Sequence, residues 1–136
     1  MPRSHDGFTL IESLVAMFLV VTIALGSAQL FTVAMARNLA AREQLAMSLL
    51  ASTKVNDLAA TAADGTIALS PPDSLDRTTA GWADTVTEAG RPYARRWRVS
   101  PVQGFGDDVV AIAVRVVPEA GAGEVRVVTI RERWRP

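Results

Sequence analysis

The fold is decided by the stretch Gly7-Phe8-Thr9-Leu10-Ile11-Glu12-Ser13-Leu14-Val15-Ala16-Met17-Phe18-Leu19-Val20-Val21. It opens an apolar segment in which Glu12 is the single charged residue between Phe8 and Ala36. The 24 uncharged residues from 13 to 36 would span roughly 36 Å as a helix, enough to cross a hydrocarbon core of about 30 Å. An ionisable side chain in such a segment costs free energy, so Glu12 is the first candidate functional residue.

A short polar leader, Met1-Pro2-Arg3-Ser4-His5-Asp6-Gly7, precedes the apolar segment. Arg3 and the amino terminus carry positive charge, and only Asp6 opposes them. The positive-inside rule therefore places the leader in the cytoplasm and the chain beyond the apolar segment on the other side of the membrane.

Two general interpretations of this segment are open. A conventional secretory signal would have a shorter apolar region and a small-residue cleavage site, for which Gly26-Ser27-Ala28 or Ala34-Met35-Ala36 could serve, and would leave an exported binding domain. A plain membrane anchor would fit the length, with Glu12 reaching toward the interface, but it does not account for Gly7 directly before Phe8.

A third interpretation uses the whole motif. The string Gly7-Phe8-Thr9-Leu10-Ile11-Glu12 resembles the class III signal of type IV prepilins and type II secretion pseudopilins. The resemblance implies that residues 1–7 are a leader removed by prepilin peptidase after Gly7, that Phe8 is then N-methylated, and that Glu12 acts in subunit assembly. It also implies other major and minor pilins, the inner-membrane assembly platform and membrane lipid as partners.

A positive charge from a neighbouring subunit would stabilise the Glu12 carboxylate. In lipid its carboxylate has no counter-charge, whereas in a bundle of identical helices the freed amine of Phe8 from another subunit can approach it. An opposite charge at short range offsets part of the desolvation cost. We therefore expect Glu12 to set the axial register between subunits.

Beyond Arg37 the apolar residues recur at spacings of three and four, which predicts an amphipathic second half of the same helix over residues 37–63. We expect its apolar face to consist of Leu39, Leu45, Ala46, Leu49, Leu50, Val55 and Leu58. Gly65 is expected to end the helix as a left-handed residue.

The remaining chain predicts a connecting loop over 64–92 and an antiparallel sheet over 93–136, with strands near 93–100, 109–117 and 125–134 and a fourth strand possible from the loop. The first strand is expected to alternate, with Tyr93, Arg95, Trp97 and Val99 on one side and Arg96 and Arg98 on the other. The expected buried face of the second strand is Val110, Ile112, Val114 and Val116, and the third strand sets Val128 and Ile130 apart from Val125 and Val127. Trp82 is expected to cover the edge of the core. The predicted fold class is α+β and pilin-like, with a long helix packed on three or four strands.

The chain offers little for catalysis. It has no cysteine and one histidine, His5, so thiolate chemistry, common zinc sites and serine or cysteine triads lack their groups. We expect no enzymatic activity, no catalytic residue, no cofactor and no metal, and we interpret Asp107-Asp108 as a turn.

The formal net charge is zero, yet eight arginines fall in the sheet region. They could form a DNA-binding face, but acidic residues are interleaved, so a solvated sheet face or a contact with other subunits is the preferred interpretation and DNA is not an expected partner. The eight are Arg95, Arg96, Arg98, Arg115, Arg126, Arg131, Arg133 and Arg135.

The small head and its aromatic and basic first strand resemble minor pilins of the PilV type and the I subunit of type II secretion. This resemblance implies a minor pilin precursor that helps to initiate or tip a type IV pilus, in adhesion or twitching motility. The alternative is a minor pseudopilin of a type II secretion system. The chain would stay in the inner membrane before assembly and then join the pilus at the cell surface or the pseudopilus.

Overall fold

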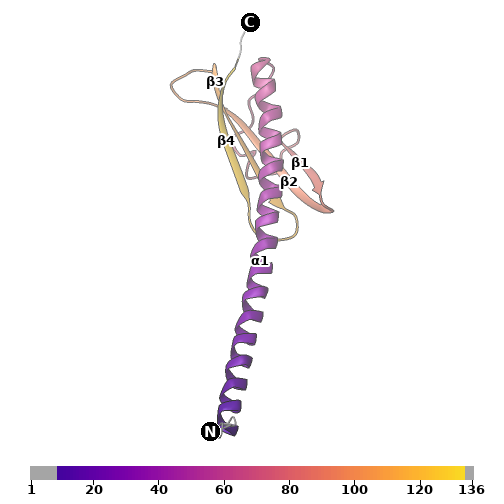
Figure 1. Ribbon diagram of the computed structural model, residues 1–136. Helices are drawn as coiled ribbons and strands as arrows, with labels where there is room; N and C mark the ends of the chain where they lie inside the picture. The colour runs from indigo at the N-terminus through magenta and orange to yellow at the C-terminus, as the bar shows by residue number, and fades with distance from the viewer. Residues whose placement is uncertain (1–8, 134–136) are drawn as a thin grey trace. The chain divides into compact units, whose positions relative to one another are not determined.

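The computed structural model describes residues 9–133, and Figure 1 shows them as a long helix followed by an antiparallel sheet. The elements are α1 (Leu10–Ala63), β1 (Ala83–Glu88), β2 (Arg91–Pro101), β3 (Val109–Pro118) and β4 (Val125–Glu132). The predicted fold class is confirmed. The chain divides into two compact units, residues 1–40 and 41–136, and α1 contributes to both.

In the first unit, α1 is continuous through Gly26, and every described residue from 9 to 40 is exposed. A Cβ added at Gly26 would meet no atom within 4 Å. Packing within the chain therefore does not require glycine at this position.

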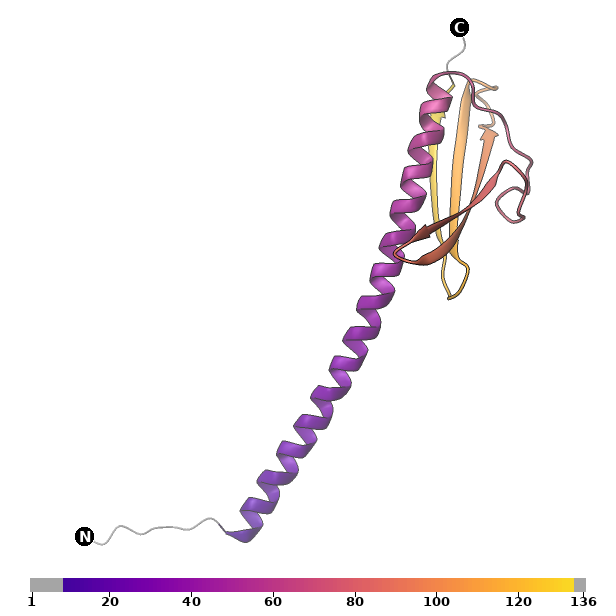
Figure 2. The same ribbon diagram turned by 90° about the vertical axis from the view of Figure 1, so that its right-hand side faces the viewer.

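In the second unit, the four strands pair in the order β1-β2-β3-β4, each antiparallel to the next. The inner face of the sheet buries the residues that the alternation predicted, and Trp82 packs at the edge of this core as expected. The strand residues of this core are Tyr93, Trp97, Val99, Val110, Ile112, Val114 and Val116. Residues 41–63 of α1 lie along this face of the sheet (Figure 2).

The predicted buried face of α1 is wrong in part. Leu45 and Leu49 are 61% and 60% exposed, and Leu39 in the first unit is exposed too. The residues that meet the sheet include Ala51 and Ala62, because small side chains bring the helix backbone close to the strands and leave little room for leucine. The helix residues of the core are Met47, Ala51, Val55 and Ala62, with Ala46, Leu50, Leu58 and Ala59 partly buried beside them.

The end of α1 is confirmed. Gly65 has a φ of 72°, and its N–H donates to the carbonyl of Ala62 at 3.1 Å, while the N–H of Thr66 donates to the carbonyl of Thr61 at 3.1 Å. These two bonds define a Schellman motif, in which a left-handed residue closes the last turn. Glycine takes this conformation without a steric penalty.

Two predicted boundaries need correction. The loop expected over 64–92 contains β1, which joins β2 through Ala89 and Gly90, with φ values of 49° and 78°. Two positive φ angles define the type I′ turn that matches the twist of paired strands, so the tight turn permits pairing despite the polar composition of β1. At the other end β4 stops at Glu132, and Trp134 lies outside the described residues.

Truncation of the inner face should be far more costly than truncation of the outer face. We expect Ile112→Ala, at a fully buried position, to lower the free energy of unfolding by about 2–5 kcal/mol, because it removes buried methyl groups and leaves a cavity. The control is Ile130→Ala, at a side chain that is 59% exposed and where about 0.5 kcal/mol is typical. Urea unfolding followed by tryptophan fluorescence measures both, and equal losses would contradict the assigned sheet faces.

Candidate functional site

The start of α1 is fixed by Thr9. Its hydroxyl oxygen accepts the N–H of Glu12 at 3.3 Å, and its carbonyl oxygen accepts the N–H groups of Glu12 at 3.0 Å and Ser13 at 3.2 Å. Thr9 is therefore the N-cap and Glu12 the third helical residue, the Thr-x-x-Glu spacing of a capping box. This spacing precedes an apolar run in the sequence and is a signal that could have placed the helix start.

The Glu12 carboxylate lies where the helix dipole favours a negative charge. Its side chain is exposed, and within residues 9–133 no hydrogen bond or ion pair involves its oxygens. Gly7 and Phe8, the predicted cleavage and methylation residues, lie outside the described residues. The structure thus places Glu12 at the first turn of an exposed helix.

The other polar side chains of this segment are satisfied within the helix. The hydroxyls of Thr22 and Ser27 donate to the carbonyls of Phe18 and Ile23, each at 2.8 Å. Such bonds to the preceding turn let hydroxyls sit in an apolar environment. By length and composition α1 is able to cross a membrane: its most apolar 18-residue window has a mean hydropathy of 2.2, and none of that window is buried.

On the inner side of the sheet, one carboxylate joins three elements. The Arg95 guanidinium donates from Nε and Nη2 to the two oxygens of Asp84, both at 2.8 Å, and the Lys54 ammonium lies 3.7 Å from the same carboxylate. Lys54 also lies 3.8 Å from the centroid of the Trp97 ring, a cation–π contact. The hydrogen bonds from Arg95 lower the pKa of Asp84, despite the opposing effect of burial, and the positive charges of Arg95 and Lys54 lower it further.

The arginines do not form the single basic face considered for DNA. Arg95 belongs to the inner cluster, whereas Arg96 and Arg98 donate to the carbonyls of Asp76 and Pro72 at 3.1 and 3.2 Å. Arg115 pairs with Asp76 and Glu124. These side chains hold the segment 70–77 over the outer face of the sheet, on the side opposite α1 (Figure 2).

The acidic pair before β3 and the remaining arginines complete the set of predicted candidates. Asp107 and Asp108 lie in the turn before β3, as expected, and residues 9–133 contain no group of three or more His, Cys, Asp or Glu side chains that could hold a metal ion. Arg126 and Arg131 are exposed on β4, and Arg135 lies outside the described residues.

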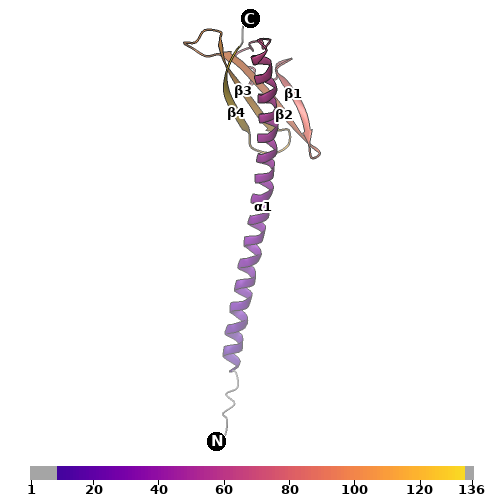
Figure 3. The same cartoon turned by 45° about the horizontal axis from the view of Figure 1, so that its top comes forward.

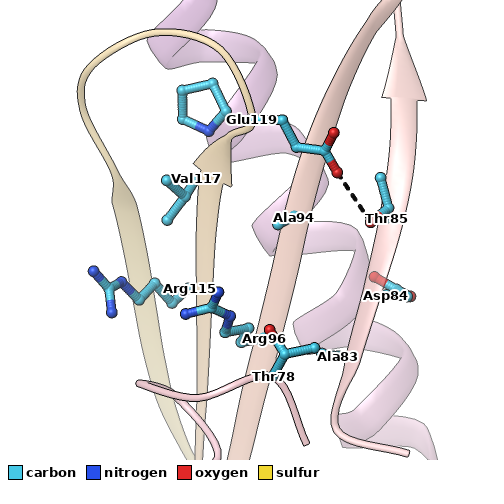
Figure 4. Close-up of a pocket in the computed structure, with 10 residues that line it drawn as sticks. Thr78, Ala83, Asp84, Thr85, Ala94, Arg96, Arg115, Val117 and Glu119 are labelled. Atoms are coloured by element: carbon cyan, nitrogen blue, oxygen red, sulfur yellow. Dashed lines mark hydrogen bonds between the residues drawn. The ribbon is translucent and has the colours of Figure 1, made fainter. Parts of the chain in front are cut away.

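A groove of about 480 Å³ crosses the outer face of the sheet (Figure 4). Ala83 and Ala94 lie in its lining, with Arg96 and Arg115 at one end and Glu119 at the other, where the Thr85 hydroxyl donates to Glu119 at 3.4 Å. Because Asp76 and Glu124 already pair with Arg115, the groove is not a concentrated positive site.

The described chain combines a helix long and apolar enough to span a membrane, a carboxylate in the first turn of that helix, and a small α+β unit. The family model described as the prokaryotic N-terminal methylation motif matches residues 2–28. This match supports a type IV pilin-like prepilin, whose family consists of structural subunits. No match was found among curated proteins or among solved structures.

The matched motif carries three general consequences. It implies processing by prepilin peptidase, assembly with other pilins, and membrane anchoring before assembly, which the long apolar helix also fits.

The inner ion cluster should make the stability of the second unit depend on pH in a defined direction. The pKa of Asp84 is lowered on folding, so its contribution is present above the ordinary aspartate pKa of about 3.9 and is lost as pH falls through the lower folded value. We expect Asp84→Asn to cost about 1–2 kcal/mol at pH 7, because it removes the charge that Arg95 and Lys54 face. That cost should shrink as pH falls below the ordinary aspartate pKa of about 3.9.

Asp57→Asn is the matched control, because Asp57 is an exposed carboxylate on α1 whose side chain makes no ion pair within the described chain. Urea unfolding at pH 7 and at about pH 3 measures the difference. An Asp84→Asn cost that is the same at both pH values, or no larger than that of Asp57→Asn, would contradict the assignment.

Proposed function

We propose that the chain is a minor pilin precursor of the PilV type, cut between Gly7 and Phe8 and N-methylated at Phe8. In this proposal it waits in the inner membrane with its second unit in the periplasm, and it then enters a type IV pilus, where it helps to start or tip the filament. A minor pseudopilin of a type II secretion system, processed in the same way, is the alternative.

One observation supports this function above the others: the methylation motif at residues 2–28 coincides with a helix that the chain itself leaves uncovered from Leu10 to Ala40. Monomeric soluble proteins rarely expose so large an apolar surface. Lipid can cover it in the membrane, and other helices can cover it in a filament.

The helix of the second unit also has uncovered apolar surface. Leu45 and Leu49 border a groove of about 290 Å³ that Glu88, at the end of β1, closes on the other side. These leucines do not belong to the core that packs on the sheet. They suit contact with neighbouring subunits once the helix has left the lipid.

Glu12 has a specific place in this proposal. Its backbone N–H is already capped by Thr9, while its carboxylate makes no hydrogen bond or ion pair within residues 9–133. The amine that cleavage frees at Phe8 of a neighbouring subunit would supply the missing positive charge. Pairing with it would favour one axial offset between subunits over others.

The mature amino terminus tests the processing step. We expect mass spectrometry of the protein from cells to find a chain that begins with N-methylated Phe8, because the leader ends at Gly7. A mature chain that begins near Gln29 would instead support a conventional signal sequence, and a chain that keeps Met1 would support a plain anchor. Either result would overturn the proposal.

Glu12→Gln tests the assembly step. The substitution keeps the size of the side chain but removes its charge, and breaking a buried ion pair costs about 3–5 kcal/mol. We expect incorporation into sheared filaments to fall by at least about tenfold, the equivalent of 1.4 kcal/mol, while the mature chain still begins at Phe8.

Ser13→Ala is the control, since it changes the adjacent polar residue without altering charge. Immunoblots of filament and membrane fractions report incorporation. If Glu12→Gln entered filaments as well as the parent protein, the register role of Glu12 would be wrong.

A further inference from the structure

β2 is longer than the strand that covers its outer side. β1 and β4 lie at the two edges of the sheet (Figure 3), and β1 pairs only with residues 91–96 of β2. The last part of β2, residues 97–101, therefore has an edge that no described strand covers. Uncovered strand edges are templates for other strands, and proteins often cover them with loops.

Loop residues close this edge. The N–H of Trp97 donates to the carbonyl of Trp82 at 3.1 Å. The N–H of Val99 donates to the hydroxyl oxygen of Ser70 at 3.0 Å, and the carbonyl of Val99 accepts the N–H of Ser70 at 2.9 Å. Pro101 has no N–H to offer. Since bonds alternate between the two sides of a strand, Ser70 takes the place of a strand residue, with its side chain as the acceptor.

Ser70 begins segment 70–77, which is tied to the sheet mainly by side chains. Within residues 9–133 the bond from Ser70 to Val99 is the one backbone hydrogen bond between this segment and the sheet. The others run from arginine side chains of β2 and β3 to carbonyl oxygens of the segment, at 3.1 to 3.4 Å. The ion pair between Asp76 and Arg115 involves a carboxylate that is 77% exposed, and exposed pairs contribute little to stability.

Closure of segment 70–77 also carries a cost. The Arg98 guanidinium lies against Pro72, to whose carbonyl its Nη1 donates at 3.2 Å, and its Nε is buried without a hydrogen-bond partner in the described chain. A buried donor without an acceptor loses the bond that it would make to water. Leu75 is buried as well, but it does not belong to the core between α1 and the sheet. The segment therefore has a small apolar anchor of its own.

We propose that segment 70–77 is a strap that opens and closes over β2 as one unit while the sheet stays folded, held shut by Leu75 and Ser70. Regions with few buried apolar contacts and few backbone bonds open at a lower free energy than the whole domain. The closed strap satisfies Val99 and keeps this edge from pairing with another strand. In the open state Val99 loses both partners, whereas Arg98 and Ser100 still bond to β3.

Adjacent amides of β2 report the two kinds of opening separately. The N–H of Val99 bonds to the strap, whereas the N–H of Ser100 faces Ala111 of β3. We expect the Val99 and Ser70 amides to share one protection factor against hydrogen exchange, at least about tenfold below that of Ser100. NMR of the full chain in detergent micelles measures it. Equal protection of Val99 and Ser100 would mean that the strap opens only with the sheet, and the proposal would fail.

Leu75→Ala tests whether the strap moves as one unit, because Leu75 makes no hydrogen bond to Val99. We expect exchange at Val99 and at Ser70 to rise by the same factor, at least about tenfold, since truncation of a buried leucine weakens the closed state. Exchange at Ser100 should not change. The control is Leu45→Ala, at a side chain that is 61% exposed on α1, which should leave all three amides unchanged. Different factors at Val99 and Ser70, or an equal rise at Ser100, would overturn the proposal.

Ser70→Ala tests the latch itself. The change removes the acceptor for the N–H of Val99 but keeps the N–H of residue 70, so a hydroxyl that did not hold the strap would alter exchange at Val99 alone. We expect the amide of residue 70 to exchange severalfold faster too, because the strap closes less often. Ser100→Ala is the matched control, since the Ser100 hydroxyl makes no hydrogen bond in the described part of the chain. Unchanged exchange at residue 70 would contradict the role of Ser70.

Discussion

The structure depends on one constraint: a helix whose apolar surface the chain cannot cover by itself. From Leu10 to Ala40 every described side chain is exposed, although the backbone is fully helical and hydroxyls such as that of Thr22 bond the preceding turn. The hydrogen bonds of this segment are thus made within the helix, whereas its apolar side chains are not buried by the described chain. Lipid or the helices of other molecules must therefore cover these apolar side chains.

After Ala41 the same helix has a different structural role. There it supplies the second layer that a four-stranded sheet needs for stability. Met47, Ala51 and Val55 cover the inner face, and Lys54 reaches Asp84 and Trp97 beside them. The head therefore uses only one face of the helix. The opposite face of residues 41–63, with Leu45 and Leu49, stays exposed.

Much of the fold could be predicted, because two periodicities were strong. The charge-free run gave the long helix, and strict alternation gave the inner faces of β2 and β3, including Val110 and Ile112. Which side of α1 packs on the sheet could not be predicted, because the close contact favours small alanines over larger leucines. A fourth strand from the loop was expected as a possibility, but its position at β1 was not predicted, because its residues are mostly polar and its pairing depends on a turn at Ala89 and Gly90. The contacts between the arginines and segment 70–77 could not be predicted from the sequence, because they join residues that are distant along the chain.

The spacing from Thr9 to Glu12 has two compatible consequences, one for the start of α1 and one for the Glu12 carboxylate. As the third helical residue, Glu12 places its side chain at the end of the helix where the dipole favours a negative charge. In a complete capping box the side chain would also bond back to the cap residue, but here Thr9 caps the helix without that bond. The helix start is thus secured by a hydroxyl, and the carboxylate keeps its hydrogen-bonding capacity. A carboxylate at this end of the helix, with no partner for its oxygens within the described chain, is suited to pair with a group of another molecule.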